Sequence, residues 1–103
     1  MLLTSSEYIS NQNTATIGLV QANVVRAKHI GKSFLAGLRA IAGGEIVEFT
    51  ELMYEARQIA VERMINESRR VGADAIVSVR FSTCSVMDGS SEVMVYGTAV
   101  KFV

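Results

Sequence analysis

The sequence predicts a two-layer α+β fold in which a small, mostly three-stranded sheet packs on one long and one short helix, in the order β-α-α-β-β. Residues 14–27 are rich in β-branched side chains, which favours a strand. Residues 48–71 repeat apolar side chains at helical spacing. Two further β-rich segments flank Asp88-Gly89, a strong hairpin signal. At 103 residues the chain has the length of one domain, so we expect a single domain over 1–103.

The first long strand is expected at residues 14–27, after an N-terminal segment, 1–13, that is a candidate interface strand. Gly18 inside the strand indicates a bulge or a close backbone approach. Apolar side chains such as Leu19 and Val20 fall on opposite faces of the strand. Both faces of the strand are therefore expected to be covered.

Two helices are expected between this strand and the hairpin. The short one covers 34–42, with Ser33 as its N-cap and the pair Gly43-Gly44 at its end. The long one covers 48–71, with glutamates near its start and arginines near its end, as the helix dipole favours. Its buried stripe is expected to comprise Phe49, Met53, Ala56, Ala60, Met64 and Val71. The methionines at core spacing are interpreted as packing residues.

The last two strands are expected at residues 75–85 and 92–102. In the first, one face is expected to carry Ala75, Val77, Val79 and Phe81. In the second, one face should carry Val93, Val95, Gly97 and Ala99, and the other Met94, Tyr96, Val100 and Phe102. One helical layer covers one face of a sheet, so the second apolar face needs another cover. A second copy of the chain is the simplest one, and we expect oligomerisation through the sheet and the short helix.

Charge and composition exclude several classes of partner. Ten Lys and Arg balance ten Asp and Glu, so no net field attracts nucleic acid or an anionic membrane surface. No apolar run approaches the ~18 residues that a membrane span needs. The first residues lack the basic and apolar regions of a secretory leader, and the chain has a single cysteine. We therefore expect no nucleic-acid partner, no membrane partner and a cytoplasmic location.

Several short segments resemble a known family. They are VRAKHIGK (25–32), GLR (37–39), GGE (43–45), TEL (50–52), EAR (55–57), GADA (72–75) and YGTAV (96–100). In this order and spacing they resemble the YbjQ family, whose domain carries a heavy-metal-binding label and whose biochemical role is not established. The likeness extends from about Gly18 to Val103. It implies a small α/β subunit, similar to dodecin subunits, that assembles into a pentameric ring.

A cluster of cations forms the first candidate site. Three cations near His29 disfavour a bound metal cation and suit an anion, and the expected helix start offers free amides. The plainer interpretation is a solvated basic turn, with Arg57 in a structural ion pair. If a small anionic ligand binds between subunits, the expected lining is Arg26, His29, Lys32, Arg39 and Arg57.

A metal site is the alternative. The chain has one cysteine, Cys84, and one histidine, His29, without the spacing of a single-chain metal site. In a ring, symmetry-related His29 side chains could converge on the axis and hold a divalent metal. Cys84 is interpreted as a buried or half-buried residue without function. A protein-interaction adaptor is a third hypothesis. With one histidine no catalytic triad can be assembled, so an enzyme is the poorest class.

Overall fold

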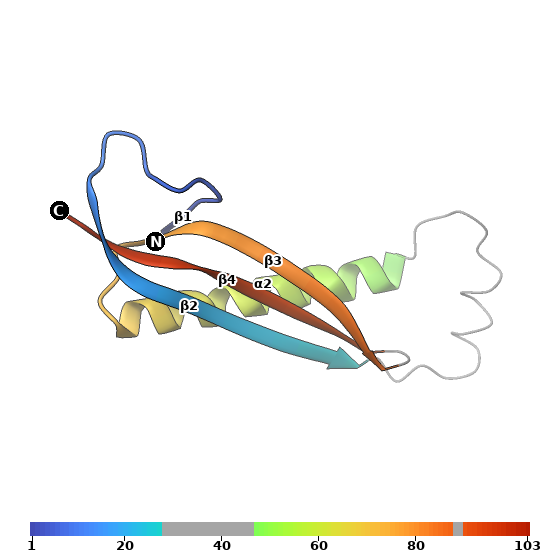
Figure 1. Ribbon diagram of the computed structural model, residues 1–103. Helices are drawn as coiled ribbons and strands as arrows, with labels where there is room; N and C mark the ends of the chain where they lie inside the picture. The colour runs from blue at the N-terminus through green and yellow to red at the C-terminus, as the bar shows by residue number, and fades with distance from the viewer. Residues whose placement is uncertain (28–46, 88–89) are drawn as a thin grey trace, which may run out of the picture.

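The computed structural model describes residues 1–27, 47–87 and 90–103, which form four strands and one helix (Figure 1). The elements are β1 (Leu2–Leu3), β2 (Thr14–Ala27), α2 (Val47–Arg70), β3 (Ala75–Met87) and β4 (Ser90–Phe102). They form one mixed sheet in the order β1-β3-β4-β2, with α2 against one face. The α+β class is confirmed. The expected short helix at 34–42 and the turn at Asp88-Gly89 lie outside the described residues.

The sheet has four strands, so the expectation of a mostly three-stranded sheet is wrong. The additional strand, β1, comes from the N-terminal segment and runs parallel to β3 of the same chain. Its register places Leu2 beside Ala75 and Leu3 beside Ile76. A strand of two residues is too short to show a period-two pattern, which explains why the sequence did not reveal it.

Helix α2 is the element that the sequence predicts best. It covers Val47–Arg70, so it begins and ends one residue earlier than the predicted helix. Ala56, Ala60 and Met64 of the predicted stripe are fully buried, whereas Val71 lies beyond the helix and is half exposed. Gly72 ends the helix with a φ of 79°, a left-handed conformation that glycine adopts without strain.

The main core lies between α2 and the strands β2 and β4. Val20 and Val24 of β2 face the helix, together with Val93, Val95 and Ala99 of β4. The predicted faces of β4 are therefore confirmed. The predicted irregularity at Gly18 is also confirmed, because the β2–β4 register shifts there.

Strand β3 departs from the predicted alternation. Ala75 and Val77 lie on the face away from α2, whereas Val79 packs into the core on the helix side. A β-bulge between them changes the parity, and Ser78 within it has a φ of 54°. Phe81 follows Val79 on the helix side, so the expectation that one face holds all four apolar residues of β3 is wrong.

The face of the sheet away from α2 is only partly covered. At one end, Ile9 of the N-terminal segment packs against a small cluster that includes Val77 and Val100. Farther along, three apolar side chains remain exposed to 68%, 55% and 36%: Leu19, Val25 and Tyr96. The protein measures 55 × 25 × 17 Å, and its radius of gyration is 17.2 Å, against about 13 Å for a compact domain of 100 residues. The chain thus forms a thin, elongated slab.

Candidate functional site

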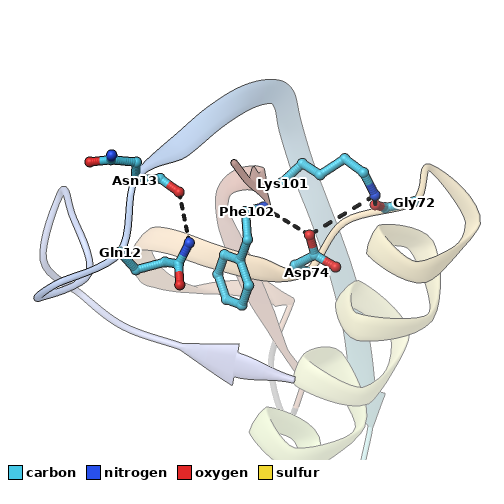
Figure 2. A network of polar contacts seen from close by, with 6 residues as sticks. All are labelled: Gln12, Asn13, Gly72, Asp74, Lys101 and Phe102. Atoms are coloured by element: carbon cyan, nitrogen blue, oxygen red, sulfur yellow. Dashed lines mark hydrogen bonds and ion pairs between the residues drawn. The ribbon is translucent and has the colours of Figure 1, made fainter.

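A polar network links neighbouring segments at the end of the molecule where the two termini lie (Figures 1 and 2). The carboxylate of Asp74 accepts a hydrogen bond from the Phe102 amide at 2.8 Å and lies 4.0 Å from Lys101 Nζ. The same Nζ donates to the Gly72 carbonyl at 3.3 Å. Beside this network, the Gln12 side-chain amide donates to the Asn13 carbonyl at 3.0 Å. Asp74 thus joins the start of β3 to the end of β4.

Gly97 also has a structural role. A Cβ at this position would lie 2.8 Å from Ile76 Cγ2 and 3.0 Å from the Val77 carbonyl oxygen. Real Cβ atoms essentially never come closer than 3.0 Å to another atom, so a side chain at this position of β4 would have to displace Ile76 or the backbone of β3. The GADA and YGTAV segments therefore each contain a residue with a structural role in the fold, Asp74 and Gly97 respectively.

Described residues line an open apolar cavity of about 360 Å³ at the edge of the sheet beside β3. It lies between the N-terminal segment, α2 and β3. Its lining is Leu3, Thr4, Ser5, Val61, Val79 and Phe81. None of these side chains is charged, so the cavity suits an apolar group and offers no acid or base for catalysis.

The bulge in β3 brings Val79 and Phe81 to the side of the sheet on which this cavity lies. The Ser78 amide donates to the Ser6 carbonyl at 2.8 Å, and the Arg80 guanidinium donates to the Ser5 carbonyl at 2.8 Å. These contacts hold the N-terminal segment along β3, and the changed parity turns Phe81 toward the helix side, where it is 48% exposed. Sequence reasoning missed the cavity because a serine at positive φ leaves no recognisable signal.

The predicted anion-binding residues are only partly within the described structure. His29, Lys32 and Arg39 lie outside the described residues. Arg26 is half-buried near the end of β2, and Arg57 is half-buried on α2. Within the described ranges, neither arginine has a carboxylate within ion-pair distance, so both remain candidates for a ligand or for a second subunit.

The described residues contain no group of three or more His, Cys, Asp and Glu that could hold a metal ion. The candidate metal residue, His29, lies outside them. Cys84 is exposed, so the expectation that it is buried or half-buried is wrong. Its Sγ lies 3.9 Å from Oε1 of Glu92, and the other carboxylate oxygen is 3.5 Å from the Asn23 amide nitrogen. In the part of the chain that the structure describes, no helix could cross a membrane.

Comparisons with known proteins agree with the resemblance. The sequence profile of the YbjQ family, described as "Putative heavy-metal-binding", matches residues 1–103. A UPF0145 protein of Vibrio parahaemolyticus is 50% identical, with 100% of this chain and 99% of that protein covered. A UPF0145 protein of Dehalococcoides mccartyi is 54% identical, with 97% of each covered.

A solved structure shows the same fold. It is a protein of unknown function from Pediococcus pentosaceus, assigned to a family named DUF74, and it matches with a TM-score of 0.67 at 17% identity. The match covers 100% of this chain and 98% of that one. Because the profile and the two UPF0145 relatives each span nearly the whole chain, the protein belongs to the YbjQ family.

Proposed function

We propose that the protein is a non-enzymatic, homo-oligomeric binding module whose subunits close into a pentameric ring and share a small anionic ligand at their interfaces. The observation that carries the proposal is the incomplete cover of the sheet. Within the described residues, one helix protects one face, while Leu19 and Val25 on the other face are 68% and 55% exposed and Phe81 beside the cavity is 48% exposed. Exposed apolar surface on a sheet is a feature of subunit interfaces.

The thin shape of the subunit supports the same proposal. The residues that the structure describes form a single helix layer on a single sheet, and the smallest dimension is 17 Å, so this part buries less apolar surface than a compact domain of the same length. Packing against like subunits adds the missing layer. Cyclic assembly also gives each interface the same residues, so a ligand site built there is repeated around the ring.

The ligand part of the proposal rests on cations at or near the expected interfaces. Arg26 and Arg57 are half-buried without a described carboxylate partner, and an anion would compensate their charge. His29, Lys32 and Arg39 complete the proposed lining. We place this function in the cytoplasm, where a free, exposed thiol such as Cys84 is stable. No described residue favours the metal alternative over the anion.

Light scattering coupled to size exclusion tests the assembly. Untagged protein is expected to give the mass of five 11.2 kDa chains, about 56 kDa. A monomer at micromolar concentration would contradict the proposal as a whole. Metal analysis of the same sample supplies the comparison with the alternative: stoichiometric zinc or copper, lost in His29→Ala, would favour a metal-binding protein.

Calorimetric titration with inorganic phosphate tests the ligand. Binding is expected to weaken at least tenfold in Arg57→Gln. Arg70→Gln is the matched control, because Arg70 lies on the same helix, is 76% exposed and pairs with Glu67 at 3.4 Å. Equal phosphate binding by the two variants, or none by the parent protein, would refute the anion site while leaving the assembly intact.

A further inference from the structure

Two strand edges of the described sheet are open. Among the described strands, β2 (Thr14–Ala27) pairs only with β4, so no described strand lies along its other edge. Strand β3 pairs with β1 only at Ala75 and Ile76, and the last backbone bond from the N-terminal segment is donated by the Val79 amide to Thr4 at 3.0 Å. Within the described residues, no strand lies beside β3 on this side beyond that bond.

Hydrogen-bonding direction identifies the groups on each open edge. Because the Val79 amide points to this edge of β3, the alternation of an extended strand turns the amides of Phe81 and Thr83 the same way. On β2, the Asn23 carbonyl points away from β4, since it accepts a bond from Arg63 of α2 at 3.1 Å. The same alternation brings the amide of Gln21 to the open edge of β2.

Both strands contain β-bulges and Arg63 bonds the Asn23 carbonyl on the β2 edge, but the stretches between the bulges lack the charges and prolines that most strongly prevent pairing. Natural edge strands are blunted by lysine, proline or inward-pointing charges. Residues 17–25 of β2 read IGLVQANVV and residues 81–87 of β3 read FSTCSVM, both without charge, and the chain has no proline. Two long, uncharged edges in one subunit are templates for strand addition.

We propose that β2 of one copy pairs with the open edge of β3 of a second copy, parallel to it, and so continues the sheet from subunit to subunit. This proposal rests on the proposed assembly of like subunits and names its interface. Both strands are antiparallel to β4, so they run in the same direction within a subunit. Copies related by a rotation can therefore join these two edges in parallel, with α2 on the same face throughout.

The cavity beside β3 supports this arrangement. Helix α2 packs on β2 and β4 and leaves Phe81 of β3 half exposed. An incoming β2 brings its own α2 on the same face, and that helix arrives over the cavity lined by Val61 and Phe81. A symmetric pairing of β2 with β2, or of β3 with β3, would leave the other edge open, whereas the head-to-tail pairing uses both and can close.

The contact area of one such junction is small. About eight paired residues at ~3.3 Å each, across a slab 17 Å thick, give roughly 450 Å² per partner, about half the ~800 Å² per partner of a standard interface. Because each copy makes two such junctions, closure of the ring holds every copy by both of its edges.

A disulfide scan tests the pairing, with the single native Cys84 as the reporter on β3. Four exposed positions on the β2 face that Cys84 shares are changed one at a time to cysteine: Leu19, Gln21, Asn23 and Val25. Mild oxidation is expected to give a ladder of covalent multimers for one or two adjacent positions. Disulfides need Cα atoms within about 7 Å, and β4 separates β2 from β3 in the same chain, so an intrachain bond is excluded.

Two controls identify other pairings. In a Cys84→Ser background the β2 cysteines should not cross-link, and a dimer there would show that β2 pairs with β2. The parent protein, with Cys84 alone, should not cross-link either, and a dimer there would show that β3 pairs with β3. Either result overturns the proposal.

A backbone variant provides a second readout. Thr83→Pro removes the amide that faces the open edge, and proline is tolerated there in a subunit by itself. Its assembly mass is expected to fall to that of a smaller species, while Thr83→Ala keeps the parent mass. If Thr83→Pro does not fold, the disulfide scan decides alone. An assembly of unchanged mass without any cross-link would refute this interface only, whereas a monomeric parent protein would refute the proposed function as well.

Discussion

The two halves of strand β3 differ in what lies beside them. The first half has β1 on one side and β4 on the other, and the Asp74 network and the N-terminal segment cover its end. Among the described residues, the second half, from Arg80 onward, has only β4 beside it, and Phe81 stands 48% exposed over a cavity. The N-terminal segment thus covers the first half of β3, and in the proposed assembly a second copy covers the rest. Substitutions in the two halves should therefore affect different equilibria.

The largest effect is expected from the closed core. Met64 is fully buried between α2 and the sheet, so Met64→Ala removes buried apolar surface and leaves a cavity. We expect the free energy of unfolding to fall by about 2–5 kcal/mol, measured by urea denaturation. Met53→Ala, on the same helix but half-buried, is the control and should lose less. Equal losses would show that the core does not end where the structure places it.

The next effect is expected at the closest approach between β3 and β4. Gly97→Ala places a Cβ within 3.0 Å of the Val77 carbonyl, a backbone atom that cannot move aside cheaply. The free energy of unfolding should fall by about 1–3 kcal/mol. Thr98→Ala changes the neighbouring residue without such a clash and should cost less. A Gly97→Ala variant as stable as its parent would contradict the close approach of β3 and β4 in the structure.

A smaller effect is expected at the Asp74 network. Asp74→Asn weakens the charge-assisted bond from the Phe102 amide, and since the Asp74 side chain is 38% exposed, water replaces part of the loss. The free energy of unfolding should fall by about 1–2 kcal/mol. Lys101→Met removes an exposed ion pair and an exposed hydrogen bond to the Gly72 carbonyl, and should cost less than about 1 kcal/mol because water replaces both. A larger loss for Lys101→Met would show that the lysine, and not the amide bond, fastens this end.

The contrast between the two halves also explains what the sequence predicts and what it does not. The period of the apolar side chains predicts helix α2 and the two faces of β4 correctly, because in these elements the pattern continues without a change of side. In β3 the periodicity misleads. Ala75, Val77, Val79 and Phe81 alternate without a break in the sequence, yet a bulge at Ser78 sends the last two to the other face.

The candidate site depends on the same hidden irregularity. A glycine such as Gly18 indicates a bulge in the sequence because glycine tolerates unusual φ values. A serine such as Ser78, whose φ is 54°, gives no such indication. Two of the residues that line the cavity, Val79 and Phe81, lie on its side of the sheet because of that bulge, so composition and spacing could not predict it. The incomplete cover of the sheet was predictable, since it follows from counting apolar faces against helical layers.

The smallest effect on the folded subunit is expected in the open half of β3. Phe81 is half exposed there, so Phe81→Ser should lower the free energy of unfolding of the dilute subunit by less than about 1 kcal/mol. Its effect on assembly should be larger, because the side chain lies where a second copy would pack. The concentration at which the assembly dissociates, followed by light scattering on dilution, should rise at least tenfold. Val103→Ser, more exposed and at the C-terminal residue outside the proposed interface, is the control and should change this concentration less. A Phe81→Ser subunit that unfolds far more easily but assembles normally would mean that the open half of β3 is completed within its own chain, and the contrast between the two halves would disappear.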